Sequence, residues 1–408
     1  MIFTTGIFAV FLALALAAYW LVPRRWAKYV LILAGFVFYT YYFPLYFLLI
    51  AAMTVLTYAA GLMIFRTREG GGRLLGTRRW FVAGILLSVL TLGYFKYWKM
   101  AVATVNALAD RLDWGVAIPA PQILVPLGIS FFTFEFIHYL TDVYLGKIRR
   151  ETVNPVDFTL FAFFFPTLVC GPIKRYQAFQ EQLARPVRFD PGGFLAGGRR
   201  VVWGMFQKLV IADTVTLLTG PLTAPETSST AMVVVAVYAY AAKIYFDFSG
   251  YSDIAIGISR MFGLAVPENF AAPYRSASIA EFWRRWHMSL SSWIRDYLFI
   301  PLGGSRVPLW RTVFNLGAVF AICGLWHGAA WNFVVWGLWH GVGMGVHRVW
   351  RTFTKGRLPW AEGRTAHAVS VLVTFHFVAL GWVLFAAPLD RAVLVFKKLA
   401  LALLTQGF

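Results

Sequence analysis

The sequence predicts an all-α polytopic membrane protein, and two observations lead to this fold class. Of the 408 residues, 59% are hydrophobic and only 13% are charged, against roughly 25% charged in an ordinary globular domain. Long apolar runs alternate with short basic segments along the whole chain, which is typical of successive membrane spans. This composition excludes a disordered chain, a fibrous protein and a soluble enzyme.

The net charge of +19 comes from 37 Lys and Arg against 18 Asp and Glu. In a soluble protein such an excess would indicate nucleic-acid binding. In a membrane protein, basic residues collect in cytoplasmic loops, so we expect no nucleic-acid partner. The two cysteines, Cys170 and Cys323, both lie in apolar surroundings, which excludes a disulfide framework and a cysteine zinc cluster.

The N-terminal run at 2–22 is interpreted as a retained first span. It lacks a basic segment in front of it and is followed at once by Arg24 and Arg25, whereas a signal peptide has the opposite arrangement. Arginines also gather at 66–79, so both basic segments are predicted to be cytoplasmic and the N-terminus to lie outside. The sequence then predicts a hairpin of 29–43 and 45–65 turning near Pro44, a span at 80–95, an outer segment at 96–120 and an inward run at 121–145.

The apolar run 156–170 interrupts this alternation. Its 15 residues are fewer than the roughly 20 that a spanning helix needs. Many basic residues follow it, among them Lys174 and Arg175, and a full crossing would place all of them outside. We therefore predict a re-entrant element that enters and leaves by the cytoplasmic face and that is broken at Pro166.

The rest of the chain is interpreted with the same rules. Between two predicted spans, the segment Gly220–Ser229 contains no Lys or Arg and is expected outside. The predicted elements are spans at 201–219 and 230–249, a cytoplasmic stretch at 250–311, a hairpin of two short helices at 312–346, a span at 366–386 and an apolar helix from 391.

His287 is the first candidate for chemistry. It lies in Glu281–Asp296, a segment with three Trp, three Arg, one Glu and one Asp. One interpretation is an interfacial amphipathic helix in which Trp and Arg anchor the protein to the membrane. The other is a substrate-binding wall in which Arg284 and Arg285 face anionic groups and His287 takes part as a polar group.

His327 is the second candidate. It lies 15 residues beyond Thr312, so a helix that begins there carries it about 22 Å into the bilayer. The flanking Gly324 and Gly328 let another group approach closely. The imidazole is either a general base or a structural group between helices. The same pentapeptide, Gly-Leu-Trp-His-Gly, recurs around His340, but His340 is nearer the cytoplasmic return, which favours His327 as the deeper group.

Three further alternatives follow from spacing. Cys323, four residues before His327, suits a Cys–His nucleophile pair or a small apolar filler. Four histidines (His287, His327, His340 and His347) resemble a metal set only superficially, because no carboxylate accompanies them, and we expect no metal. Asp247 and Asp253 either cap helices, as Ser249 also would, or line a polar cavity.

Several long motifs resemble the membrane-bound O-acyltransferase family, and in particular its alginate O-acetyltransferase branch. The similarity covers roughly residues 30–390. The motifs are Val125-Pro-Leu-Gly-Ile-Ser130, Gly171-Pro-Ile-Lys-Arg-Tyr176, Tyr245-Phe-Asp-Phe-Ser-Gly-Tyr-Ser-Asp-Ile-Ala-Ile-Gly257, Pro267-Glu-Asn-Phe270, Glu281-Phe-Trp-Arg-Arg-Trp-His-Met-Ser-Leu-Ser291, Trp293-Ile-Arg-Asp-Tyr297, Pro301-Leu-Gly-Gly304 and Leu325-Trp-His-Gly328.

This resemblance implies a single integral-membrane domain over 1–408, shorter at its C-terminal end than is usual in the family. The implied fold is a ring of transmembrane and re-entrant helices around a central funnel. His327 corresponds to the family's catalytic histidine and His287 to its second essential position. The residues expected to bind donor or substrate are Trp283, Arg284, Arg285, Trp286, Ser289, Asp296, Lys174, Asp247, Asp253 and Asn332.

The implied activity is transfer of an acetyl or other acyl group in the bacterial inner membrane. The donor is a cytoplasmic thioester, expected to be acetyl-coenzyme A as co-substrate, and no cofactor is bound. The acceptor is a hydroxyl of a cell-envelope polysaccharide, as in exopolysaccharide acetylation and alginate biosynthesis, or a secreted or periplasmic protein that relays the acetyl group. Membrane lipid surrounds the protein. The alternatives are a D-alanyl transferase that uses a carrier-protein thioester, and a non-enzymatic transporter.

Overall fold

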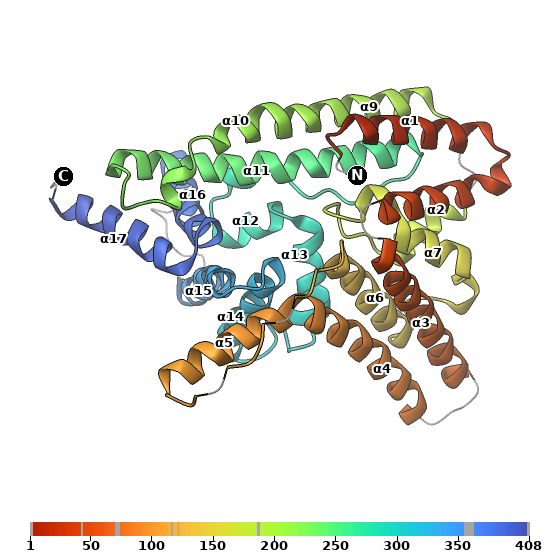
Figure 1. Cartoon of the computed structure of the whole chain (residues 1–408), viewed down its shortest axis with the longest axis horizontal. Coiled ribbons are helices and arrows are strands. Elements are labelled where there is room, and N and C mark those ends of the chain that lie inside the picture. The colour runs from red at the N-terminus through yellow and green to blue at the C-terminus, as the bar shows by residue number, and fades with distance from the viewer. Residues whose placement is uncertain are drawn as a thin grey trace. The chain divides into compact units, whose positions relative to one another are not determined.

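A computed structural model describes residues 3–41, 44–69, 74–115, 117–120, 122–185, 188–354 and 363–405. Part of the predicted basic segment at 66–79 lies outside these residues. Within the described part of the chain every regular element is a helix (Figure 1), which confirms the predicted all-α class. Five helices among the described residues are long and apolar enough to cross a membrane: Pro44–Glu69, Leu75–Arg111, Thr230–Met261, Leu309–His327 and Arg364–Ala386.

The chain divides into two compact units. The first contains residues 1–202 and 251–267, and the second contains residues 203–250 and 268–408. The boundaries cut through two long helical segments, so each unit draws on separate parts of the chain. The units are described one at a time below.

The first unit begins with α1 (Gly6–Leu21), α2 (Arg24–Thr40) and α3 (Pro44–Glu69). Helices α2 and α3 pack against each other, which confirms the predicted hairpin at Pro44. Pro23 is the N-cap residue directly before α2, where a proline costs no helical hydrogen bond because it precedes the first turn.

Most of the segment 96–120, predicted to lie outside, is helical, and its side of the membrane stays a prediction. Helix α4 (Leu74–Leu92) continues through the π-helical turn Gly93–Tyr97 into α5 (Trp98–Arg111). Lysines do not break a helix, and Lys96 donates a hydrogen bond to the Ser130 hydroxyl at 3.3 Å. Charge indicates on which side a segment lies but does not mark where its helix ends.

Helix α6 (Ile129–Tyr144) leads to α7 (Pro155–Phe163), which the side chain of Asn154 caps. Nine residues span about 14 Å, less than half of a bilayer core of about 30 Å. A single 3₁₀ turn at Phe165–Thr167, which contains Pro166, follows. The segment is therefore short and broken as predicted, and a re-entrant path remains the prediction for it.

Single cysteines test the re-entrant path. We expect cysteines placed at Glu69, Glu151 and Gln180 to react with a membrane-impermeant maleimide only from the cytoplasmic side, because the basic residues around them favour that side. The labelling of each cysteine is compared between inverted and right-side-out vesicles. Reaction of position 180 from the outside would show that α7 is part of a full crossing.

Two predicted spans begin or end at different residues in the structure. One continuous helix runs through α9 (Pro191–Phe206), a π-helical turn at Gln207–Ala212 and α10 (Asp213–Thr216). Helix α11 (Thr230–Met261) continues 12 residues beyond the predicted end at 249. Its last part keeps apolar side chains at helical spacing, including the buried Ile254 and Ile258, so the helix extends into the stretch predicted to be cytoplasmic, whose side of the membrane stays a prediction.

The first unit also contains α8 (Tyr176–Leu183). The helices after α11 belong to the second unit. They are α12 (Ile279–Arg285), α13 (Met288–Ile294), α14 (Leu309–His327), α15 (Trp331–Thr354), α16 (Arg364–Ala386) and α17 (Leu389–Thr405). Helices α14 and α15 form an extensively packed hairpin, which confirms the predicted pair at 312–346. Both helices are longer than the short ones expected, and α14 is itself long enough to cross a membrane.

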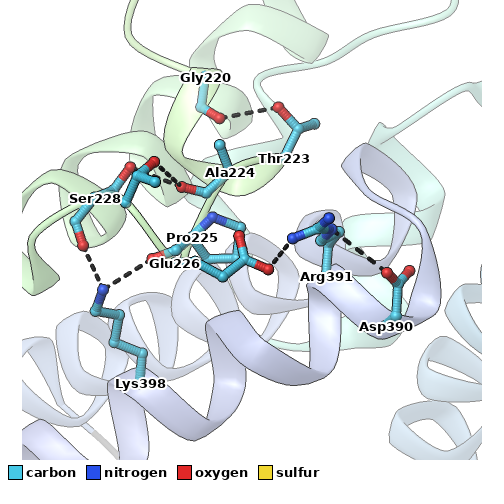
Figure 2. A network of polar contacts seen from close by, with 10 residues as sticks. Gly220, Thr223, Ala224, Pro225, Glu226, Ser228, Asp390, Arg391 and Lys398 are labelled. Carbon is cyan, nitrogen blue, oxygen red and sulfur yellow. Dashed lines mark hydrogen bonds and ion pairs between the residues drawn. The ribbon is translucent and has the colours of Figure 1, made fainter.

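Polar contacts attach the loop before α11 to α17 (Figure 2). The ammonium group of Lys398 donates hydrogen bonds to the backbone oxygens of Ser228 and of Pro225, the latter at 2.8 Å. Arg391, about two turns before Lys398 on α17, forms an ion pair with Glu226. This loop is thus held against the last helix by its backbone as well as by charge.

Candidate active site

His287 lies between two helices, at an interruption of the single continuous helix that the sequence predicted. Helix α12 ends at Arg285 and α13 begins at Met288, and His287 between them has a φ angle of 43°. Such a left-handed conformation costs a non-glycine residue roughly 1–2 kcal/mol. The single-helix prediction over Glu281–Asp296 is therefore wrong.

Backbone hydrogen bonds from residues 269–271 stabilise this interruption between α12 and α13. The backbone N–H of Met288 donates to the carbonyl of Asn269 at 3.0 Å, and the N–H of Ala271 donates to the carbonyl of Arg285 at 3.0 Å. These two bonds join residues 269–271 to the chain on both sides of His287. The backbone groups that a continuous helix would use internally are satisfied by this pairing instead.

The His287 side chain is 1% exposed. Its Nδ1 atom lies 3.3 Å from the amide oxygen of Asn269, and its ring contacts Phe248 edge-on at 4.5 Å between centroids. Burial, and to a lesser degree the neighbouring His327, hold the pKa of His287 well below its ordinary value of 6.5. His287 is consequently neutral at physiological pH.

The tryptophans around His287 face inward. Trp283, Trp286 and Trp293 are all buried, so the interpretation of this segment as an interfacial helix anchored by tryptophan is wrong. Arg284 is exposed on α12, whereas Arg285 forms an ion pair with Glu281 at 2.7 Å.

Two further residues predicted to bind substrate, Ser289 and Asp296, also have polar partners within the protein. The Ser289 hydroxyl donates a hydrogen bond of 2.7 Å to the Asn269 amide oxygen, and the Asp296 carboxylate pairs with Arg295 at 2.8 Å. Ser289 is buried beside His287, while Arg295 is exposed.

His327 is the last residue of α14. The 19 residues of this helix carry it about 28 Å from the helix start, somewhat further than the sequence estimate. Its ring is half-buried and is surrounded by aromatic rings at centroid distances of 4.7 Å to Trp326, 5.1 Å to Trp336 and 5.3 Å to Phe385. The His287 ring lies 6.5 Å away, so the structure brings the two candidate histidines together.

The glycines around His327 serve the packing of the helix hairpin. A Cβ atom on Gly324 would lie 2.0 Å from the backbone oxygen of Phe333, and one on Gly328 would lie 2.1 Å from the Phe333 ring. On α15, a Cβ atom on Gly337 would lie 2.1 Å from the backbone oxygen of Phe320. The group that approaches closely is therefore α15, which corrects the expectation that the glycines leave room for another group.

His340, in the second copy of the pentapeptide, has a different environment. It is fully buried, and neither of its ring nitrogens has a hydrogen-bond partner. Aromatic rings enclose it, with centroids 5.0 Å away for Trp336 and 5.2 Å for Trp283. His327 is instead half-buried and lies 6.5 Å from the His287 ring, so the geometry favours His327 over His340.

Four of the predicted binding residues form their own internal contacts. Lys174 is 2% exposed and pairs with Glu135 at 2.5 Å within the first unit, so it is no free cytoplasmic cation. Asp253, also in the first unit, pairs with Arg200 at 2.8 Å. In the second unit Asp247 pairs with Lys208 at 2.9 Å and Asn332 donates to the carbonyl of Leu384 at 3.2 Å.

The helix-capping alternative for Asp247 and Asp253 is wrong, because both lie inside α11. Ser249 caps no helix either, since its hydroxyl donates to the side-chain oxygen of Gln207 at 2.5 Å. Cys323 is 1% exposed, as a small apolar filler would be. Among the described residues, no three His, Cys, Asp or Glu side chains gather as metal ligands would.

An apolar cavity of about 660 Å³ lies elsewhere in the second unit. It is lined by residues of α11, α16 and α17, among them Tyr238, His376 and Leu399, and not by His287 or His327. The cavity is thus separate from the candidate site.

Asn269 is the residue at this site that the sequence analysis missed. Its side chain is fully buried and contacts both His287 and Ser289. The motif Pro267-Glu-Asn-Phe270, noted only for its resemblance, was the available signal. Local spacing alone could not connect it with a histidine 18 residues further along the chain.

The fold and the site define a polytopic membrane protein with a pair of histidines enclosed by aromatic rings. The membrane-bound O-acyltransferase family profile matches residues 36–386, and the chain belongs to this family. It is therefore an O-acyltransferase, as the motifs predicted.

Three relatives show the range of the similarity. A probable alginate O-acetylase of Pseudomonas aeruginosa is 38% identical over 388 residues, which are 95% of this chain and 72% of the relative. The peptidoglycan O-acetyltransferase of Helicobacter pylori is 33% identical over 96% of this chain and 76% of its own length. The teichoic acid D-alanyltransferase of Bacillus subtilis is 30% identical over 66% of this chain and 70% of its own length.

Proposed function

We propose that this protein transfers an acetyl group from acetyl-coenzyme A, bound from the cytoplasm, across the bacterial inner membrane to a hydroxyl acceptor. The acceptor is a cell-envelope polysaccharide, or a periplasmic protein that relays the acetyl group to one. The juxtaposition of His287 and His327 is the observation that carries the proposal. Relatives named as O-acetylases match about 95% of the chain, whereas the D-alanyltransferase matches only 66%, which favours acetyl over D-alanyl transfer.

In the proposed reaction His327 acts as the general base. It accepts the proton of the acceptor hydroxyl while the oxygen attacks the thioester carbonyl carbon, so that a C–O bond forms. The C–S bond then breaks, and the departing thiolate takes the proton from the His327 imidazolium. The surrounding rings of Trp326, Trp336 and Phe385 keep the base in an apolar setting, which favours transfer to the bound acceptor over hydrolysis.

Proteoliposomes test this function directly. We expect radiolabelled acetyl-coenzyme A on the cytoplasmic side to label a polysaccharide acceptor, such as an alginate or peptidoglycan oligosaccharide, on the opposite side. Labelling only from a D-alanyl carrier protein would establish the alternative transferase. Labelling from neither donor, with the purified relay candidates also present, would contradict the proposed function.

Donor binding depends on Arg284 in this proposal. Because Arg284 is exposed and Arg285 is paired with Glu281, we expect Arg284→Ala to raise the KM for acetyl-coenzyme A about tenfold, the loss of one charge-assisted hydrogen bond. Initial rates at varied donor concentration measure the effect. Arg285→Ala is the matched control, with a smaller increase expected. An unchanged KM in Arg284→Ala would leave this arginine as a surface charge.

A further inference from the structure

We infer that Asn269 is a positioning residue that fixes the tautomer of His287 and thereby makes its Nε2 atom a hydrogen-bond acceptor. The inference rests on the proposed function, in which His287 lies at the reacting centre, and it assigns a direction to the hydrogen bond that His287 makes there. His287 then accepts a hydrogen bond from the reacting groups and does not donate one to a developing oxyanion.

The amide oxygen of Asn269 receives several donors at once. The Ser289 backbone N–H lies 3.4 Å from it, the Ser289 hydroxyl 2.7 Å and the His287 Nδ1 atom 3.3 Å. The backbone N–H of Ser289 can only donate, so the atom that it faces is the oxygen of the amide and not its nitrogen.

The identity of this oxygen decides the state of the imidazole. An amide oxygen cannot donate, so Nδ1 of His287 carries the hydrogen. In a neutral imidazole only one ring nitrogen carries a hydrogen, and Nε2 therefore has a free lone pair. His287 is neutral because it is buried beside a second histidine.

The surrounding backbone makes the arrangement rigid. The Asn269 carbonyl accepts the Met288 N–H group, so residue 269 holds both the backbone and the side chain of the His287 segment. His287 keeps a left-handed conformation that its residue type disfavours. Strained residues of this kind are maintained where the surrounding structure determines them, most often at functional sites.

The variant Asn269→Asp separates positioning from simple packing. It keeps the shape and the accepting oxygen but adds a negative charge beside the imidazole, which raises the pKa of His287. His287 then becomes protonated at a higher pH, and the acidic limb of the kcat profile should move upward by about one unit or more. Activity should be lost near pH 6 and regained at higher pH. Asn269→Leu, which has no acceptor, should lower kcat at least tenfold across the profile.

A spectroscopic readout keeps the test independent of acyl transfer. In protein labelled with ¹⁵N-histidine, the His287 signals, assigned by their absence in His287→Gly, should show a protonated Nδ1 and an unprotonated Nε2. Glycine tolerates the left-handed backbone, so His287→Gly should fold while losing the ring. If the wild-type protein shows the expected tautomer but no acetyl transfer, the proposed function is contradicted and this inference is not.

Asn106→Asp is the matched control, because the Asn106 side chain forms hydrogen bonds with the exposed backbone of Ile118, far from any histidine in the sequence. It should leave the pH profile unchanged. The inference is overturned if Nε2 carries the hydrogen in the wild type, or if Asn269→Asp lowers kcat equally at every pH.

Discussion

Replacement of His327 by alanine is expected to lower the rate of acyl transfer by about 10²–10⁴-fold, the usual contribution of a general base. The protein should still insert and bind donor, because His327 is half-buried at the end of α14 and the hairpin is packed through other residues. Transfer rates at saturating donor, together with donor binding, measure the two effects separately. His327→Gln keeps hydrogen-bonding capacity but cannot take the proton, so it should be nearly as inactive.

The duplicate pentapeptide supplies a control for this prediction. His340→Phe puts an apolar ring of similar size into an enclosed aromatic environment where neither imidazole nitrogen is bonded, and it should retain acyl transfer. If His327→Gln is active and His340→Phe is not, the roles of the two copies are exchanged. Cys323→Ala should also remain active, and an acetylated Cys323 trapped during turnover would instead establish a two-step route.

Gly337→Ala is expected to prevent accumulation of folded protein. The added Cβ would lie 2.1 Å from the Phe320 backbone oxygen and 3.2 Å from the Cα atom of Gly324. Backbone atoms of two packed helices cannot rotate away as a side chain can, so the destabilisation should reach or exceed the roughly 1–3 kcal/mol typical of overpacking. The yield and thermal stability of detergent-solubilised protein are the measurements.

Gly317→Ala is the matched control on the partner helix. Apart from the nearby backbone of its own helix, no described residue has an atom within 4 Å of the Cβ that this change adds, and alanine favours a helix over glycine by about 1 kcal/mol. Its yield should equal or exceed that of the wild type. Equal stability of Gly337→Ala and Gly317→Ala would contradict the close approach of the two helices.

Much of the helix arrangement could be predicted because the membrane imposes it. Apolar runs located the helices that contain Pro44–Glu69 and Arg364–Ala386, and the basic segments predicted the hairpin of α14 and α15. The ends of helices were less accessible to prediction. The predicted spans ended before Lys96 and Asp253, yet each residue lies inside a longer helix, where a polar group from a segment distant in the sequence contacts its charge.

The site was predictable only in part for the same reason. The rise per residue of a helix predicted that His327 lies deep in the bilayer, and the family resemblance singled out His287. The break at His287 depends on hydrogen bonds to residues 269–271, which override a local pattern that favours a continuous helix. The role of Gly324 was misassigned because a glycine in a sequence does not reveal whether a ligand or a neighbouring helix occupies the space beside it.

The close approach of α14 and α15 also limits how the enzyme moves during turnover. Gly324 and Gly337 bring the backbones so near each other that sliding of one helix along the other would drive carbonyl oxygens into Cα atoms. The hairpin must therefore move as one rigid body, with His327 fixed at its tip. Opening and closing of the site, and the release of products, then depend on displacement of elements other than this hairpin.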